Sequence, residues 1–318
     1  MKNSLIKYCF LVLCVGCIKA HGQNDFFFNH YMFNPSYFNP AWAGSEPDAF
    51  LAAHHRTQWA GYNATFDPGS APSTQLVSLV VPAKGLVSGF GITAVNDRQF
   101  GLRSNQIRFQ VSLSRQLSTG TLSLGLAPSI NIQSLDPGDF RPSDPTEQFG
   151  TKQSQLRPNF HAGIKYEFSR YEVGLSVENI IEPQFNLNGF DQLDYFQRNV
   201  NLFVIRDFGI SRDLIIRPSL LARADPGNLS NFSLDLTAIL EYQNKMWGGV
   251  AFKRSEAISI LLGYTFLDNQ LKAGYSFDYV VQEQDAKEPT SHEIFIRYNL
   301  PDLIFGGRKA VKTPRFAF

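Results

Sequence analysis

Cysteine is scarce in this sequence and is confined to its beginning. The chain has three cysteines, at positions 9, 14 and 17. If this leading region is removed on export, the remaining chain has no cysteine for a disulfide, for thiol chemistry or for a metal ion. No site of these kinds is therefore expected in the processed protein.

Charged residues and long apolar runs are also few. Charged residues make up 18% of the chain, below the roughly 25% of ordinary soluble domains. The net charge is +1 with no long like-charge run in residues 48–300, which argues against a nucleic-acid partner. No apolar stretch after the leading region reaches the ~18 residues of a membrane-spanning helix. Aromatic residues, in contrast, reach 14%, while the mean hydropathy is only −0.16.

The first 22 residues have the pattern of a secretory signal peptide. Lys2 and Lys7 precede an apolar run over residues 9–18, and small residues lead to Gly22. We expect cleavage between Gly22 and Gln23. A lipoprotein signal with Cys17 as the lipidated residue is the alternative; Gly16 fits it, but Cys14 stands where Leu is usual.

The rest of the chain alternates between apolar and polar residues in short segments. Residues 107–113 show the pattern clearly, with Ile107, Phe109 and Val111 in one phase and Arg108 and Gln110 in the other. Successive side chains of a strand point to opposite faces, so such a segment has one apolar and one polar face. About fourteen such segments recur, each near the 9–11 residues that cross a membrane as a tilted strand. The sequence therefore predicts an all-β fold, an antiparallel outer-membrane barrel of about fourteen strands.

The links between these segments differ in length by parity. Those after even-numbered segments are tight turns, such as residues 169–170, whereas the long links, 60–72, 134–157, 180–197 and 280–291, all follow odd-numbered segments. Outer-membrane barrels have short periplasmic turns and longer surface loops. Both termini are therefore expected in the periplasm.

Two segments lie outside the alternating pattern. Residues 23–47 are rich in aromatic residues and Asn-Pro pairs, and residues 301–318 form a basic tail. So many aromatic side chains are unfavourable in water without a partner surface, so we expect the first segment to act as a partial plug or to contact a partner. The predicted organisation is thus a signal (1–22), an aromatic and Asn-Pro-rich segment that is either periplasmic or a plug (23–47), a barrel (48–300) and a periplasmic tail (301–318). The candidate plug or partner contacts are Tyr31, Phe33, Asn34, Pro35, Asn39, Pro40 and Trp42.

No motif for catalysis, for a cofactor or for a metal ion is evident, so none of these sites is predicted. His54 and His55 are neighbours on a strand and face opposite ways, so they do not chelate one ion. The three Asp-Pro-Gly sequences, at 67–69, 136–138 and 225–227, favour turns. A calcium site at Asp136, Asp139 and Asp144 matches no known loop signature. Charged residues in the polar phase either line a pore or pair with one another: Arg108, Lys165, Glu167, Glu172, Glu178, Asp235, Glu241, Lys272 and Asp278.

Several motifs, in order along the chain, resemble the PorP/SprF family of the type IX secretion system of Bacteroidetes. They are His30-Tyr-Met-Phe-Asn-Pro35, Asn39-Pro-Ala-Trp-Ala-Gly-Ser45, Arg56-Thr-Gln-Trp-Ala-Gly-Tyr62, Gly89-Phe-Gly-Ile-Thr-Ala-Val-Asn-Asp97, Arg157-Pro-Asn-Phe-His-Ala-Gly163, Gly174-Leu-Ser-Val-Glu-Asn179 and Pro314-Arg-Phe316. The sequence departs from the family pattern at Ser36-Tyr-Phe and at Ala317-Phe318.

The resemblance implies a non-enzymatic outer-membrane barrel for protein secretion, gliding motility or both. Its implied partners are outer-membrane lipid, periplasmic lipoproteins of the secretion machinery and a large surface-protein client that it helps to export or attach. The alternative is a transport channel, either a porin or a carrier of hydrophobic compounds. The two differ in whether the lumen is blocked.

Overall fold

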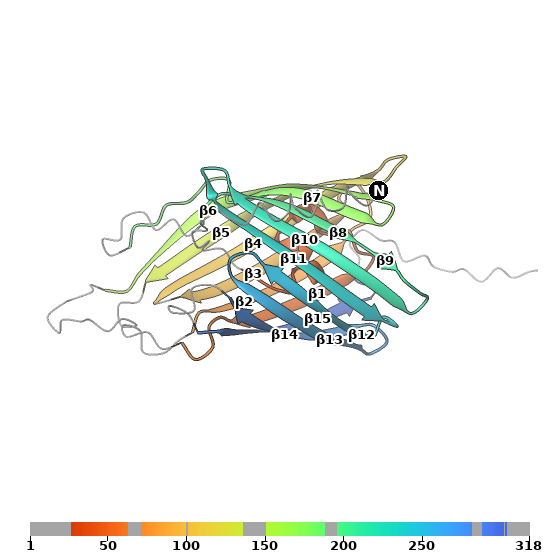
Figure 1. Cartoon of the computed structure of the whole chain (residues 1–318). Helices are drawn as coiled ribbons and strands as arrows, with labels where there is room; N and C mark the ends of the chain where they lie inside the picture. The colour runs from red at the N-terminus through yellow and green to blue at the C-terminus, as the bar shows by residue number, and fades with distance from the viewer. Residues whose placement is uncertain are drawn as a thin grey trace, which may run out of the picture.

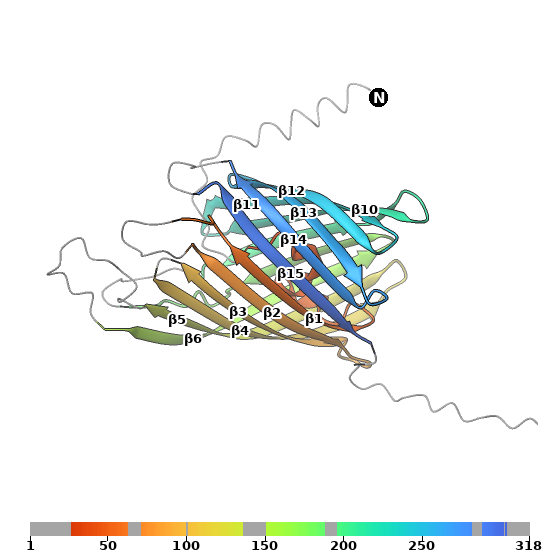
Figure 2. The same cartoon turned by 90° about the horizontal axis from the view of Figure 1, so that it is seen from below.

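The structure is a closed barrel of antiparallel strands (Figures 1 and 2). This computed structural model describes residues 27–62, 71–99, 101–135, 151–187, 196–281, 288–301 and 303, without the side chains of 229–231. The strands are β1 (Ala49–Thr57), β2 (Ser73–Pro82), β3 (Gly89–Gln99), β4 (Leu102–Gln116), β5 (Thr121–Leu135), β6 (Gln153–Phe168), β7 (Tyr171–Glu178), β8 (Asn199–Arg206), β9 (Phe208–Gly209), β10 (Leu214–Asp225), β11 (Asn228–Tyr242), β12 (Met246–Lys253), β13 (Ala257–Phe266), β14 (Leu271–Val280) and β15 (Thr290–Leu300).

Each strand pairs with its neighbours in sequence, and β1 pairs with β15 to close the sheet. β8 and β9 both pair with β10 and form one strand interrupted at Asp207, so the described barrel has fourteen strands. The predicted fold class and strand number are confirmed. Among the described residues, no helix is long and apolar enough to cross a membrane.

The alternating pattern places side chains as predicted. Ile107, Phe109 and Leu113 point outward and are exposed, whereas Arg108 on the same strand is buried. The two histidines at 54 and 55 also face opposite ways, His54 into the barrel and His55 out of it. The apolar phase therefore faces the lipid, and the polar phase faces the lumen.

Some predicted boundaries were wrong. The alternation in the sequence predicts a strand over residues 86–96, whereas β3 begins at Gly89 and runs to Gln99. β6 begins at Gln153, so the expected long link over residues 134–157 includes strand residues at both of its ends. The alternation is weak there because residues 153–158 include Pro158 and Ser154 among the outward positions.

The links sort by length to the two ends of the barrel. One end, the short-turn end, carries tight turns such as residues 169–170, between β6 and β7, and 243–245, between β11 and β12. Ser169, Gln243 and Asn244 have positive φ angles of 54°, 52° and 54°, as tight hairpins require. The other end, the long-loop end, carries every long link, and β1 starts and β15 ends at the short-turn end.

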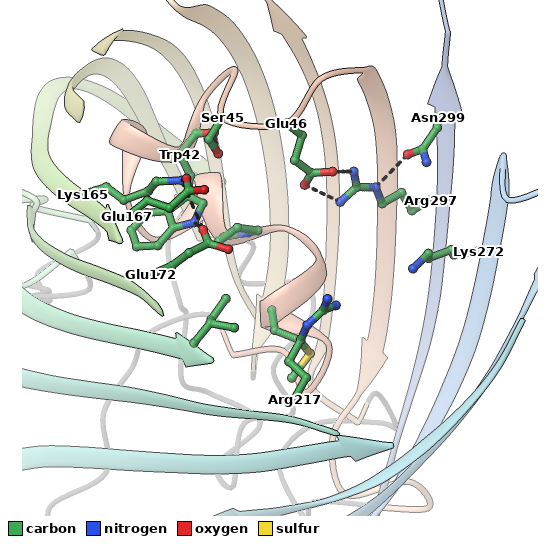
Figure 3. A pocket seen from close by; sticks show the side chains of 13 residues that line it. Trp42, Ser45, Glu46, Lys165, Glu167, Glu172, Arg217, Lys272, Arg297 and Asn299 are labelled. Atoms are coloured by element: carbon green, nitrogen blue, oxygen red, sulfur yellow. Dashed lines mark hydrogen bonds and ion pairs between the residues drawn. The ribbon is translucent and has the colours of Figure 1, made fainter. Parts of the chain in front are cut away.

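Residues 27–48 precede β1 and fold as short 3₁₀ turns inside the barrel (Figures 1 and 3). They are η2 (Tyr31–Phe33), η3 (Pro35–Tyr37) and η4 (Pro40–Trp42). Proline suits the first helical position because its missing N–H has no partner there. Asn39 caps η4 by accepting a hydrogen bond from the Ala41 backbone N–H at 2.9 Å. We call residues 27–45 the plug segment.

Candidate functional site

The plug segment fills the lumen, and its side chains form the centre of the buried apolar cluster. From Phe27 to Ala43 every residue is buried. The plug residues in the apolar cluster are Phe28, Tyr31, Met32, Phe33, Tyr37, Phe38, Trp42 and Ala43. They pack against apolar side chains of the wall, such as Phe203, Trp247 and Phe295. Burying apolar and aromatic surface stabilises the packed state by roughly 25 cal/mol per Å².

The start of the segment is held by charged residues of the wall. Asn29 and His30 both donate to the Glu293 carboxylate, at 2.6 Å through the Asn29 N–H and at 3.1 Å through the His30 N–H. The His30 ring Nδ1 lies 2.6 Å from the same carboxylate. Asn29 also donates from its side chain to Asp278 and to Ser276. These contacts fix the segment near the long-loop ends of β14 and β15.

Phe27 lies among three cations of the wall. Lys253 Nζ is 2.9 Å from the centre of its ring, and the guanidinium carbons of Arg223 and Arg56 are at 4.8 and 5.8 Å. A cation over an aromatic face is attracted by the ring quadrupole, more strongly when water is excluded. This side chain, which the sequence analysis did not single out, is therefore an anchor of the segment.

Side chains of the wall also bind the backbone carbonyls of the segment. Gln110 donates to Ser36 O at 2.9 Å, Ser176 to Phe38 O at 2.7 Å, and Arg297 to Phe33 O at 2.8 Å. Arg108 donates to Tyr37 O, and Ser112 donates to Ala43 O. Short 3₁₀ turns leave many carbonyls without an internal partner, and a buried carbonyl without any partner costs about 1–3 kcal/mol. Side chains of the barrel wall thus provide hydrogen bonds that the backbone of the plug segment cannot form within itself.

Glycines of the wall provide the space into which the plug segment packs. A Cβ atom on Gly163 would lie 2.0 Å from Asn39 Oδ1, and one on Gly174 would lie 2.1 Å from the Trp42 ring. A Cβ on Gly125 would lie 2.2 Å from the Ala41 backbone nitrogen. These glycines lie on β5, β6 and β7, and β5 and β6 are the strands that contact η4 most. The wall is shaped to this segment, and any larger residue at these positions would displace it.

The candidate residues in the first half of the segment are all buried. The Tyr31 hydroxyl lies 3.1 Å from Ser219 Oγ, and Phe33 stacks on Phe295 with ring centres 5.2 Å apart. Asn34 donates to Ser78 Oγ at 3.0 Å. Pro35 begins η3. Tyr31, Phe33 and Asn34 contact three different strands around the barrel, β10, β15 and β2, so they hold the segment in the middle of the lumen.

The candidate residues in the second half are buried against β5, β6 and β7. Asn39 donates from its amide to the carbonyls of Ile164 and Leu175, at 3.1 and 3.0 Å. Pro40 lies against Gly125. Trp42 donates from its ring nitrogen to Glu172 at 2.8 Å, and Lys165 Nζ lies 5.3 Å from its ring centre. All seven candidates are buried, in contact with the barrel wall or with other residues of the plug segment.

The charges in the polar phase pair with one another. Arg108 binds Glu178 at 2.9 Å, Lys165 binds Glu167 at 3.0 Å and Glu172 at 3.2 Å, and Arg56 binds Asp278 at 2.6 Å. Of the two interpretations left open by the sequence, pairing is therefore the one that the structure shows. Glu293, Arg297, Arg56 and Glu46 belong to these pairs but were missed. Arg56, Glu293 and Arg297 lie in the polar phase of their strands, which gave a signal, but alternation alone does not identify a partner. Glu46 lies before the first strand and gave no such signal.

A cavity opens beside the plug segment at the short-turn end (Figure 3). Its volume is about 320 Å³, and Met32, Pro35, Trp42, Ser45 and Glu46 of the plug side form part of its wall. Across from them lie Lys272 and Arg217, while Glu46 and Arg297 form an ion pair at its edge. The carboxylates of Glu46, Glu167 and Glu172 are 42, 47 and 35% exposed, whereas Lys165 and Arg297 are nearly buried. Arg217 and Lys272 are 25 and 20% exposed, so the mouth presents accessible charges of both signs.

The remaining predictions concern metals and turns. Among the described residues, no group of three or more His, Cys, Asp and Glu side chains is placed to hold a metal ion. Asp136, Asp139 and Asp144 lie outside the described residues, as do two of the three Asp-Pro-Gly sequences. The third, at 225–227, joins β10 and β11, and Asp225 Oδ1 accepts from the Gly227 N–H at 2.7 Å. At this position the turn prediction is confirmed.

A barrel with this sequence pattern matches one family. A family model described as "Type IX secretion system membrane protein PorP/SprF" matches residues 20–298. The chain belongs to this family. The resemblance found in the sequence is thus confirmed, and a barrel of this family is located in the outer membrane.

Solved structures of outer-membrane proteins resemble this PorP/SprF protein in fold. Omp33 of Acinetobacter baumannii has 6% identity and a TM-score of 0.47, covering 80% of this chain and 99% of that one. A mutant of the TodX monoaromatic hydrocarbon channel has 10% identity and a TM-score of 0.46, covering 86% and 94%. Outer membrane phospholipase A of Escherichia coli has 10% identity and a TM-score of 0.37, covering 79% and 92%. No curated protein has a significantly similar sequence.

Proposed function

We propose that this PorP/SprF protein is a non-enzymatic adaptor of type IX secretion that helps to export or attach a large surface protein. The observation that carries the proposal is the plug segment, which occupies the lumen from Phe27 to Ala43 with buried side chains. A channel needs an open path lined by water, whereas an adaptor needs a rigid scaffold with surfaces at its two ends. A lumen filled by the protein's own chain favours the adaptor over a porin or a hydrocarbon carrier.

The two ends of the barrel suit different partners. We place the short-turn end in the periplasm because all long links gather at the other end, as in outer-membrane barrels generally. A periplasmic lipoprotein of the machinery would then meet the mouth cavity, where Ser45 and Glu46 are accessible and the seven candidate plug residues are not. The surface-protein client would meet the long-loop end. This orientation puts the end of β15 in the periplasm, whereas the described chain begins at Phe27 beside the long-loop ends of β10 and β12. The expectation of a periplasmic terminus is therefore kept here for the C-terminal end alone.

Deleting residues 24–43 tests the proposal. The truncated barrel should still insert, because the strand ladder does not depend on the plug segment, but it should conduct ions and fail to support secretion of its client. Single-channel conductance and the amount of client on intact cells are the two measurements. Deleting residues 138–148 of the β5–β6 link is the control for conductance, since it leaves the plug intact. A truncated barrel that stays closed and still supports secretion would show that the segment neither seals the lumen nor serves export.

A further inference from the structure

β6 extends well past its neighbour β7 at the long-loop end (Figure 2). Their ladder runs from Phe168–Tyr171 to Ala162–Val177 and then stops. On its other side β6 stays paired with β5 as far as Gln153, and β5 stays paired with β4 as far as Leu135. Residues 154–158 therefore form an edge of the sheet that has no paired strand among the described residues, and this edge projects beyond the rest of the barrel.

The first positions beyond the ladder are satisfied locally. The Phe160 carbonyl accepts from the Ile180 N–H at 3.0 Å, and the Phe160 N–H donates to Asn159 Oδ1 at 2.8 Å. The backbone of Phe160 thus faces the β7 side. In an antiparallel strand every second residue faces the same side, so the next backbone groups on this edge belong to Pro158, Leu156 and Ser154.

Beyond Phe160 the edge has backbone groups without backbone partners. Within the described part of the chain, no backbone bond joins Ser154 or Leu156 to residues 179–186. The Leu156 carbonyl accepts only from the exposed side chain of Arg157, at 3.1 Å. Pro158 has no N–H to offer, which is tolerated on an edge. The edge therefore presents two N–H groups and three carbonyls to an incoming strand.

This edge lies in water and not in lipid. A tilted strand crosses the hydrocarbon layer with about 9–11 residues, so counting from Phe168 the membrane part of β6 ends near Pro158. Unpaired backbone groups are too costly within lipid. Residues 153–157 are consequently accessible from outside the cell if the long-loop end faces outward, as the proposed function requires.

A groove follows this edge. The link after β7 runs beside β6 but is joined to it through side chains: the Asn186 N–H donates to Gln155 Oε1 at 3.2 Å, and Arg157 Nε donates to Gln184 O at 3.3 Å. Between them is an open groove of about 880 Å³ with Pro158, Ile181 and Pro183 in its wall. Gln155 and Arg157 belong to the inward phase of β6, so the link is held towards the lumen and leaves the edge open on the outer side.

The charge of the groove favours an acidic occupant. Glu182 is already paired with Arg198 at 3.2 Å. Arg157 binds backbone and amide oxygens, and in the described part of the chain it has no carboxylate partner. Counting only the described residues, the groove has one cation in excess, and an incoming strand that bonds to Leu156 O would free the Arg157 guanidinium for a carboxylate.

We propose that the free edge of β6 binds an extended, acidic segment of the surface-protein client as an added β-strand. The inference rests on the proposed function for the identity of the partner. Backbone bonds to Ser154, Leu156 and Pro158 provide affinity, and Arg157 with the apolar wall of the groove provides selectivity, as in other cases of strand addition. Pro158 limits the added strand to a short segment and so restrains uncontrolled edge pairing.

The binding test uses the full-length protein in detergent and a short peptide of alternating Val and Asp residues. The peptide should bind to the native protein, and N-methylation of its edge-facing amides should weaken binding by about tenfold or more. Leu156→Pro should have a similar effect, because it removes an N–H that faces away from β5. Leu156→Ala, the matched control, keeps that N–H and should bind normally. Arg157→Gln should weaken binding of the Asp peptide but not of a Val-Thr peptide.

Folding of each variant is checked by its heat-modifiable migration on gels. The proposal is overturned if the peptide does not bind the native protein, if the N-methylated peptide binds equally, or if folded Leu156→Pro binds like the native protein. Self-association that Leu156→Pro abolishes, without peptide binding, would assign the edge to a second copy and also overturn it. Client display in cells is measured separately: normal display without the whole protein refutes the proposed function, whatever the peptide result.

Discussion

At the scale of single residues, the alternation along one strand sets the cost of a charge. Leu124 on β5 is 51% exposed and faces lipid, whereas its neighbour Ser123 is 1% exposed and faces the lumen. Leu124→Arg places a cation in hydrocarbon and should destabilise the barrel by about 2–4 kcal/mol. Ser123→Arg places no charge in lipid, so the part of its destabilisation that depends on the lipid should be smaller. Its effect should come instead from disturbed packing in the lumen. Urea unfolding in lipid vesicles measures the loss of stability in both variants. If the loss caused by Leu124→Arg is equal in thick and in thin bilayers, the assignment of faces is contradicted.

The pair of Arg108 and Glu178 shows how the interior charges depend on one another. Arg108 Nη1 is 2.9 Å from Glu178 and also donates to Tyr37 O. Arg108→Met leaves a buried carboxylate without its cation, which typically costs about 3–5 kcal/mol. The double variant Arg108→Met, Glu178→Met should recover part of that loss, since neither charge is then unpaired. A double-mutant cycle on unfolding free energy tests this, and strict additivity of the two losses would mean that the pair contributes nothing.

At the scale of elements, the fit between η4 and its glycine seats can be tested by adding bulk. Gly163→Val places side-chain atoms where Asn39 Oδ1 now lies, since a Cβ alone would approach it to 2.0 Å. The strand ladder should form, because valine favours strands, but the plug segment should be displaced and protease should cleave it. Gly248→Val on the lipid side of β12 is the control, where the nearest atom is the flexible end of Leu262 at 3.3 Å. A plug segment that stays protected in the Gly163 variant would show that the seat does not matter.

The elements also show what can be read from the sequence and what cannot. The strands were predictable because lipid on one side and protein on the other impose a period of two, as in residues 107–113. The aromatic content of residues 23–47 indicated a buried segment, but not its path. That path depends on glycines such as Gly125, Gly163 and Gly174, which look alike in sequence whether they line a turn, a bulge or a contact. It also depends on partners such as Glu293 for His30, which are 263 residues apart.

At the scale of the whole molecule, the distribution of links fixes an orientation that surface labelling can test. The link after β5 is long and the turn after β4 is short, so Thr151 and Ser118 lie at opposite ends of the barrel and both are exposed. Since the chain after the leading region has no cysteine, Thr151→Cys and Ser118→Cys each introduce one unique thiol. A membrane-impermeant maleimide should label the Thr151 variant on intact cells, and the Ser118 variant only after the outer membrane is opened.

The reverse labelling pattern would mean that the barrel has the opposite orientation in the membrane. The mouth cavity with Ser45 and Glu46 would then face outward, and the free edge of β6 would lie in the periplasm. A periplasmic lipoprotein, and not the surface protein, would then be the partner available for strand addition. Labelling of both variants on intact cells would instead indicate a damaged membrane, which a periplasmic marker protein with its own thiol detects. If the plug segment closes the lumen as proposed, the reagent has no route through the barrel itself, and conductance of the two cysteine variants checks this condition.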